Sequence, residues 1–226
     1  MTAGGADSAI AAIVFDFDGL LMDTETTSLA SWRYEWSQWG LELDESHFFV
    51  DHGGDTTAER YAQLANAVGT EYNQLLSHER RTAYRETRHL ELDLAPGIAA
   101  WIDEARSSGL RLAVASSSPA DWVTKHLHRV GRLESFETLA CGDDVDAHKP
   151  APDVYRLALQ HLGVDSDNAV AVEDTPHGVA SARAAGLRCI AIPSPYFDHA
   201  RFEEANLVLD SAEEMSLREA LSRLGH

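Results

Sequence analysis

Short, continuous apolar runs are the feature that most constrains the fold of this chain. The run at 10–15 is apolar throughout and stops abruptly at Asp16. A run of this length without polar alternation fits a strand that is buried on both faces, as in a parallel sheet. Similar runs follow at 110–115, 169–172 and 188–192, and weaker ones at 138–141 and 207–209. The chain is therefore predicted to form a parallel sheet.

Helical patterns separate these runs. Apolar residues recur at helical spacing from Ile98 to Ala105, and further helices are expected around 154–162 and 176–185. Another helix is expected to begin with Ser118 as its N-cap and Pro119 at its first position, and to carry Trp122 among its apolar residues. Alternation of strand and helix with short connections predicts a Rossmann-like α/β fold with right-handed crossovers.

The segment 20–92 interrupts this alternation. It contains aromatic residues and helical patterns but no convincing strand. An ordinary crossover with extra helices is the alternative, but a connection of about 70 residues is far beyond the usual length. We therefore expect an all-helical cap domain at 20–92, inserted into an α/β core domain made of 10–19 and 93–226. Residues 1–9 are predicted to be a disordered lead-in.

The charge balance excludes two classes of partner. The formal net charge is −19, from 18 basic and 37 acidic residues, so the surface repels nucleic-acid backbones and anionic membranes.

No apolar run approaches the length of a membrane helix, and residues 1–8 lack the layout of a signal peptide. The two cysteines, Cys141 and Cys189, are interpreted as reduced core thiols. A reducing cytoplasm is the expected location.

Two carboxylates follow the first apolar run. Asp16 and Asp18 are two apart, so their side chains are expected to project together at the carboxyl edge of the sheet, where ligands usually bind. Their mutual repulsion calls for a cation or a shared proton, and a divalent metal with oxygen ligands satisfies this. Gly19 allows close approach by a ligand. A calcium loop is excluded because Leu20 and Leu21 replace the residues it needs, but a solvated turn remains an alternative.

Two other strand ends carry groups that suit a phosphate. Ser116 and Ser117 follow the run at 110–115, where a hydroxyl and free backbone N–H groups can donate to phosphate oxygens. Lys149 lies between strands, ahead of Pro150 and Pro152, and a fixed ammonium there could neutralise a phosphoryl group. The competing interpretations are helix capping for a serine and an ordinary surface position for the lysine.

A second acidic pair, Glu173 and Asp174, follows the run at 169–172. Asp174 or Thr175 could instead be the N-cap of the next helix. Two acidic pairs at one sheet edge would be strongly destabilising without a cation. Each of these signals is weak by itself. Their joint order is far more specific: carboxylate pair, hydroxyl, lysine, carboxylate pair, each after a predicted strand or in the loop that follows it.

In the order and local sequence of these motifs, the chain resembles the haloacid dehalogenase superfamily over about residues 10–209. The phrases that carry the resemblance are Phe15-Asp16-Phe17-Asp18-Gly19, Ser116, Lys149-Pro150-Ala151-Pro152-Asp153 and Glu173-Asp174-Thr175-Pro176-His177-Gly178. They are most similar to a subgroup of small phosphatases and β-phosphoglucomutases that carries a helical cap after the first strand.

The resemblance implies a fold, a cofactor and a set of roles. It implies strand order 5-4-1-2-3 and a Mg²⁺ ion held by Asp16, Asp174 and the backbone carbonyl of Asp18, with Glu173 supporting the metal through water. Asp16 would be the nucleophile, and the Asp18 side chain the general acid and then base. The implied ligands of the phosphate are Gly19, Ser116, Ser117 and Lys149. The expected reaction is hydrolysis of a small phosphorylated metabolite, with a sugar phosphate favoured.

Other functions within the superfamily fit less well. A dehalogenase needs neither Asp18 nor the acidic pair, and a phosphonate-cleaving enzyme needs a cap lysine that 20–92 lacks. A β-phosphoglucomutase would be expected to have His where Ser28 stands, and also uses a cap lysine. A catalytically silent metal- or phosphate-binding protein stays open. For specificity, 53–56 resembles a substrate-facing loop, and one of Arg80, Arg81, Arg85 and Arg88 could reach the substrate. A monomer is expected, with a dimer left open.

Overall fold

The computed structural model describes residues 10–46, 48, 56–194 and 197–224. The predicted lead-in 1–9 and the part of the predicted substrate loop at 53–55 lie outside these residues. The chain forms two compact units, one made of Met1–Met22 with Leu94–His226 and the other of Asp23–Asp93. We refer to them as the sheet unit and the helical unit. None of the described helices is long and apolar enough to cross a bilayer.

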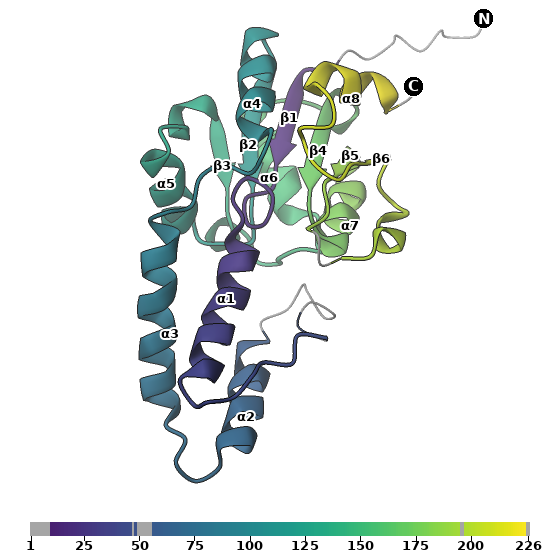
Figure 1. Cartoon of the computed structure of the whole chain (residues 1–226). Helices are drawn as coiled ribbons and strands as arrows, with labels where there is room; N and C mark the ends of the chain where they lie inside the picture. Colours follow the sequence, from purple (N-terminus) through teal and green to yellow (C-terminus); the bar gives the residue numbers. More distant parts are fainter. Residues whose placement is uncertain (1–9, 47, 49–55, 195–196, 225–226) are drawn as a thin grey trace, which may run out of the picture. The chain divides into compact units, whose positions relative to one another are not determined.

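The sheet unit is built on six parallel strands in the order β3-β2-β1-β4-β5-β6 (Figure 1). Their bounds are β1 Ala12–Phe15, β2 Arg111–Ala115, β3 Thr138–Ala140, β4 Ala169–Glu173, β5 Arg188–Ala191 and β6 Leu207–Val208. Read from the other edge, this is the predicted order 5-4-1-2-3, with β6 added beside β5. The predicted α/β fold is therefore confirmed.

Strand β1 lies at the centre of the sheet, and all four of its residues are fully buried. Its register pairs Phe15 with Val114 of β2 on one side and with Val172 of β4 on the other. The ladder with β4 continues one residue further, where the Asp16 N–H donates to the Val172 carbonyl at 2.9 Å. Because the three strands run parallel and in step, the residues that follow them meet at one edge.

Helices follow the strands of this unit. They are α4 Ile98–Ser107, α5 Ala120–Arg129, α6 Asp153–Leu162, α7 Pro176–Ala184 and α8 Leu217–Arg223, with short 3₁₀ helices at Leu133–Ser135, Gly142–Asp144, Ser166–Asn168 and His199–Phe202. The N-cap of helix α7 is Thr175, one of the two residues expected there. Its hydroxyl accepts from the Gly178 N–H at 3.1 Å, and Pro176 is the first helical residue. Cys141 and Cys189 are buried, free thiols.

The predicted start of α5 is wrong by one residue. Pro119 itself is the N-cap, with an extended backbone, and Ser118 makes no capping hydrogen bond. The first N–H of the helix, on Ala120, is instead satisfied at 3.0 Å by the carboxylate of Asp143, from a 3₁₀ turn further along the chain. Since Asp143 satisfies this N–H group, the Ser118 hydroxyl is available for another contact, described below.

The described part of the helical unit contains three helices and no strand. They are α1 Thr24–Ser37, α2 Thr57–Val68 and α3 Gln74–His89. Leu29, Trp32 and Leu64 are fully buried and form the apolar centre of this unit. The predicted all-helical insertion after the first strand is confirmed as part of the fold.

Buried polar groups connect α1 to α3. Glu35 is fully buried, and its carboxylate accepts hydrogen bonds from Trp39 at 3.0 Å, Ser77 at 2.6 Å and Arg80 at 2.6 Å. The guanidinium of Arg81, which is only 4% exposed, donates to Ser31 and Tyr61 and stacks 3.8 Å from the centre of the Trp32 ring. Arg88 pairs with Glu91. Three of the four arginines considered for the substrate are therefore engaged inside this unit.

Candidate active site

Three carboxylates converge at the edge of the sheet where β1 and β4 end. Asp16, Glu173 and Asp174 each place a carboxylate oxygen within 4.8 Å of the others. All three residues are buried, at 6%, 0% and 1% exposure. The register of β1 against β4 explains this, because Asp16 comes directly after the residue paired with Val172, and Glu173 and Asp174 follow Val172. The structure thus brings Asp16 and Asp174 together, as their proposed shared ion requires.

Lys149 supplies the positive charge beside these carboxylates. Its Nζ atom donates to Asp16, to Oε1 of Glu173 at 2.6 Å and to the carbonyl of Ala115 at 2.8 Å. Burial alone would lower the pKa of Lys149, but the Asp16 and Glu173 carboxylates outweigh it and hold the pKa above its usual value. Lys149 is therefore a buried ammonium ion that reaches across from the loop before α6, and not an ordinary surface lysine.

One ammonium does not balance three buried carboxylates. Burial raises the pKa of Asp16 to about 8, although Lys149 acts in the opposite direction, and Glu173 and Asp18 add to the rise. The cluster offers hard oxygen ligands and no sulfur or imidazole group. Mg²⁺ and Ca²⁺ prefer such ligands. By charge and by donor type, the residues present fit a divalent cation of this kind.

Glu173 is fixed from three directions. Its Oε1 atom accepts from the Tyr155 hydroxyl at 2.7 Å as well as from Lys149, and Oε2 accepts from the Asp174 N–H at 3.2 Å. Helix α7 packs directly against the carboxylate: a Cβ atom on Gly178 would lie 1.9 Å from Oε2. A larger residue at Gly178 would therefore displace Glu173 from its position beside Lys149.

The Asp18 side chain is held apart from this cluster. Its Oδ2 atom accepts from the Ser118 hydroxyl at 2.6 Å, and Oδ1 accepts from the indole N–H of Trp122 at 3.0 Å. Asp18 is absent from the group of carboxylates that lie within 4.8 Å of one another in the described residues. Its carboxylate is therefore oriented by side chains of the β2–α5 connection and of α5.

The residues predicted to bind phosphate lie in different settings. Ser116 is 1% exposed, and its hydroxyl oxygen accepts from the Ser118 N–H at 3.0 Å, which leaves the hydroxyl able to donate to a ligand. Ser117 is exposed. Gly19 has a φ of 87°, and its N–H donates to the Met22 carbonyl at 2.7 Å, so this donor already has a partner. The phosphate-binding roles of Gly19, Ser116 and Ser117 stay predictions.

Sequence reasoning missed three residues that hold the site in place: Ser118, Trp122 and Tyr155. Trp122 fits the pattern of an apolar helix residue, and Tyr155 lies between the apolar helix residues Val154 and Leu157. A signal did exist, because an indole N–H or a phenol hydroxyl on a buried helix face needs a hydrogen-bond partner. The sequence alone could not identify that partner.

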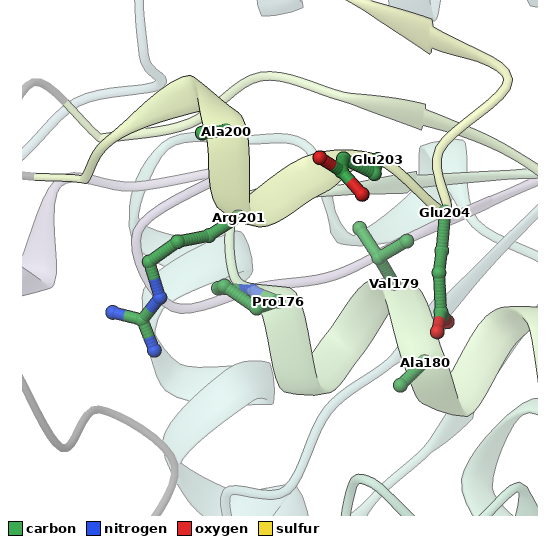
Figure 2. A pocket seen from close by; sticks show the side chains of 7 residues that line it. All are labelled: Pro176, Val179, Ala180, Ala200, Arg201, Glu203 and Glu204. Atoms are coloured by element: carbon green, nitrogen blue, oxygen red, sulfur yellow. The ribbon is translucent and has the colours of Figure 1, made fainter.

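Two other features lie outside the cluster. A pocket with a volume of about 240 Å³ lies between α7 and the 3₁₀ helix His199–Phe202, and Figure 2 shows the side chains that line it. None of the predicted site residues lines this pocket. Its lining residues are Pro176, Val179, Ala180, Ala200, Arg201, Glu203 and Glu204. Cys141, Asp143 and Asp144 also lie close together. Burial raises the pKa of Cys141 to about 12, so this thiol stays protonated, and Asp143 and Asp144 satisfy backbone N–H groups.

Comparison with known proteins places the chain in a family. Residues 13–192 match the family model of haloacid dehalogenase-like hydrolases. The chain is similar to the putative phosphatase YhcW of Bacillus subtilis, with 33% identity over 219 residues that cover 95% of this chain and 98% of the relative. The match spans both units described above and all the predicted site residues.

Two solved structures extend this likeness. A variant of CbbY from Rhodobacter sphaeroides in complex with xylulose 1,5-bisphosphate is 33% identical, with a TM-score of 0.72 and coverage of 92% of this chain and 98% of that one. A haloacid dehalogenase family hydrolase from Deinococcus radiodurans with bound phosphate and sodium is 26% identical, with a TM-score of 0.82 and coverage of 97% and 98%. These matches confirm the resemblance read from the four motifs. This chain belongs to the family of haloacid dehalogenase-like hydrolases.

Proposed function

We propose that this protein is a Mg²⁺-dependent phosphatase that hydrolyses a small phosphate monoester through an aspartyl-phosphate on Asp16. The observation that carries the proposal is the convergence of Asp16, Glu173 and Asp174 around one buried point, with Lys149 bonded to two of them. Such a centre attracts a divalent cation and, once the cation is bound, a phosphoryl group. A purely structural cluster would gain nothing from an excess of buried negative charge.

The first half of the reaction transfers the phosphoryl group. An Asp16 carboxylate oxygen forms a bond to phosphorus as the bond from phosphorus to the ester oxygen breaks. The Asp18 carboxyl gives its proton to the departing alcohol oxygen, so that a neutral alcohol leaves. The Ser116 hydroxyl donates a hydrogen bond to a non-bridging oxygen, and the Lys149 ammonium, held against Asp16, stabilises the charge on these oxygens electrostatically.

The second half regenerates the carboxylate. Asp18, now ionised, takes a proton from a water molecule while the water oxygen attacks phosphorus. The bond between phosphorus and the Asp16 oxygen breaks, which releases inorganic phosphate and returns Asp16 to its starting form. Asp18 thus ends the cycle protonated, ready for the next ester, and protons and electron pairs balance over the two halves.

Asp16, Asp174 and the Asp18 carbonyl would hold the Mg²⁺ ion, with Glu173 acting through water. The ion, when bound, supplies the positive charge that lets an anionic carboxylate approach an anionic phosphate. Glu173 also has a role that does not depend on the metal. It accepts a hydrogen bond from Lys149, which also donates to Asp16, and so keeps the ammonium directed at the nucleophile.

A sugar phosphate is the proposed substrate class. The CbbY structure with xylulose 1,5-bisphosphate supports it, because that relative matches nearly the whole of this chain. The helical unit is proposed to act as the cap that reads the rest of the substrate, and the strongly acidic surface favours a small metabolite over a nucleic acid. We propose that the enzyme acts in the cytoplasm as a monomer.

The test is phosphate release from p-nitrophenyl phosphate and from a panel of sugar and nucleotide phosphates. Wild-type protein is assayed with Mg²⁺, with a chelator, and after Mg²⁺ is restored. Asp16→Asn and Asp174→Asn are each expected to abolish release, whereas Asp167→Asn, at an exposed aspartate far from β1 in sequence, serves as the matched control and retains it. Chelator-resistant activity, or full activity in Asp16→Asn, would contradict the proposal.

A further inference from the structure

Trp122 makes a contact that the proposed reaction does not yet use. Its indole N–H donates to Oδ1 of Asp18 at 3.0 Å, although 104 positions separate the two residues. The Ser118 hydroxyl donates to the other oxygen, Oδ2, at 2.6 Å. Each oxygen of the carboxylate proposed to move protons therefore has its own donor, one rigid and one on a rotatable hydroxyl.

The indole is itself held firmly. Trp122 lies in the first turn of α5, and the His126 ring, one turn later, packs against it with 4.2 Å between the ring centres and 63° between the ring planes. His126 is only 2% exposed, and the neighbouring Val123 is fully buried. The His126 ring also lies 6.3 Å from Phe17, the residue between Asp16 and Asp18. The indole N–H is thus directed by a packed helix face and not by a mobile loop.

The two donors differ in what they permit. An indole N–H can only donate, so the oxygen that it contacts must act as an acceptor whether or not Asp18 carries a proton. A serine hydroxyl can donate to a carboxylate and can also accept from a carboxylic acid by rotating. Because a carbonyl oxygen is a better acceptor than the hydroxyl oxygen of a carboxylic acid, the indole contact favours a proton on Oδ2 of Asp18, and Ser118 can accommodate both states.

We propose that Trp122 is a positioning residue for the proton transfer of this enzyme: its indole N–H fixes Oδ1 of Asp18 and thereby reserves Oδ2 as the atom that gives and takes the proton. This inference rests on the proposed phosphatase function. Alignment of the proton-carrying oxygen matters most when the leaving group is a strong base, because such a group departs slowly unless it is protonated.

The test compares Trp122→Phe with the wild type on two aryl esters of similar shape. Phenyl phosphate releases a strongly basic phenolate, whereas the p-nitrophenolate released by p-nitrophenyl phosphate is a weak base that departs readily without a proton. We expect kcat/KM for phenyl phosphate to fall about tenfold in Trp122→Phe, and kcat/KM for p-nitrophenyl phosphate to change by less than about twofold.

Trp101→Phe is the matched control. This substitution also removes an indole N–H group, which in Trp101 donates to the Met215 carbonyl at 3.0 Å. Trp101 lies on α4 and not on α5. Its kcat/KM is expected to change by the same factor for both esters. If Trp122→Phe does not fold by circular dichroism, Trp122→Leu, which also lacks the N–H, takes its place.

The outcomes separate the two proposals. A tenfold change in the ratio of the two kcat/KM values that is confined to the Trp122 variants supports the inference. An equal loss on both esters, or no loss, overturns the positioning role while the phosphatase proposal stands. If wild-type protein with Mg²⁺ hydrolyses neither ester nor any member of the wider panel, the proposed function fails and the inference falls with it.

Discussion

The Nζ atom of Lys149 lies 2.6 Å from Oε1 of Glu173, a carboxylate with no solvent exposure, and the same nitrogen donates to Asp16. One ammonium therefore serves acidic groups at the ends of two neighbouring strands, β1 and β4. The Tyr155 hydroxyl reaches the same Oε1 atom, so the position of Lys149 depends on a helix as well as on the sheet.

Lys149→Met is expected to lower kcat/KM by about 100- to 1,000-fold, because a charge that stabilises the phosphoryl oxygens is lost. The metal-free variant should also lose about 3 kcal/mol in its free energy of unfolding, since the buried Glu173 carboxylate loses its ammonium partner. Steady-state kinetics and urea unfolding measure the two effects. The chain contains one other lysine, the exposed Lys125, and Lys125→Met should change neither quantity.

Gly178→Ala tests the close packing of α7 on Glu173. The added methyl group would lie 1.9 Å from Oε2, so the carboxylate has to move away from Lys149. We expect a loss of about 2 kcal/mol in stability together with a clear fall in kcat/KM. Ala180→Gly on the same helix should cost about 1 kcal/mol through helix propensity alone and leave kcat/KM intact. Unchanged activity in Gly178→Ala would show that the position of Glu173 is unimportant.

Mg²⁺ affinity is expected to rise with pH. In the metal-free protein the raised pKa of Asp16, about 8, means that its carboxyl keeps a proton up to that pH, whereas an unfolded aspartate loses it near pH 4. The metal-free protein should therefore lose stability as pH rises from about 4 to 8. The cation displaces this proton, so its Kd should fall by up to about tenfold per pH unit between pH 6 and 8.

Isothermal titration with Mg²⁺ at pH 6, 7 and 8 measures this dependence. Repeating the titration in two buffers with different heats of ionisation counts the protons released. Asp16→Asn, which has no proton to lose at this position, should bind more weakly and lose most of the pH dependence. A Kd that is equal at all three pH values in the wild type would mean that Asp16 is already ionised before the metal binds.

The helical unit offers a comparison between a buried and an exposed ion pair. Glu35→Ala removes the acceptor of four hydrogen bonds from three side chains in a fully buried position, and about 3 to 5 kcal/mol should be lost. Glu45→Ala breaks a pair with Arg33 in which both side chains are well exposed, at 38% and 50%, and should cost less than about 1 kcal/mol. Hydrogen exchange of the α1 and α3 amides would resolve the difference within this unit.

The sheet was predictable because its strands carry an unusually plain signal. Each residue of β1 is apolar, and the first charged residue after it, Asp16, marks the edge where the strand ends. The same logic located Ser116, Glu173 and Asp174. The pairing of β1 with β4 did not follow from these patterns, because strand order depends on how crossovers pack; it came from the resemblance to a known family.

What the sequence could not supply were contacts between distant residues. Ser118 is a residue type that favours the N-cap position, yet the Ala120 N–H at the start of α5 is satisfied by Asp143, 23 positions away. Trp122 reads as an apolar helix residue because its ring is apolar, and only the fold reveals that Asp18 lies within reach of its N–H. In each case local propensity identified the side chain, while its partner was chosen by tertiary packing.

The central place of β1 has a consequence for how the protein is made. Both of its neighbours in the sheet, β2 and β4, come later in the chain than the whole helical unit. A nascent chain leaving the ribosome therefore carries a fully apolar strand with two unpaired edges until the second half of the polypeptide has emerged. Such a segment is prone to aggregate, and chains that stop before β4 should depend on chaperones or be degraded.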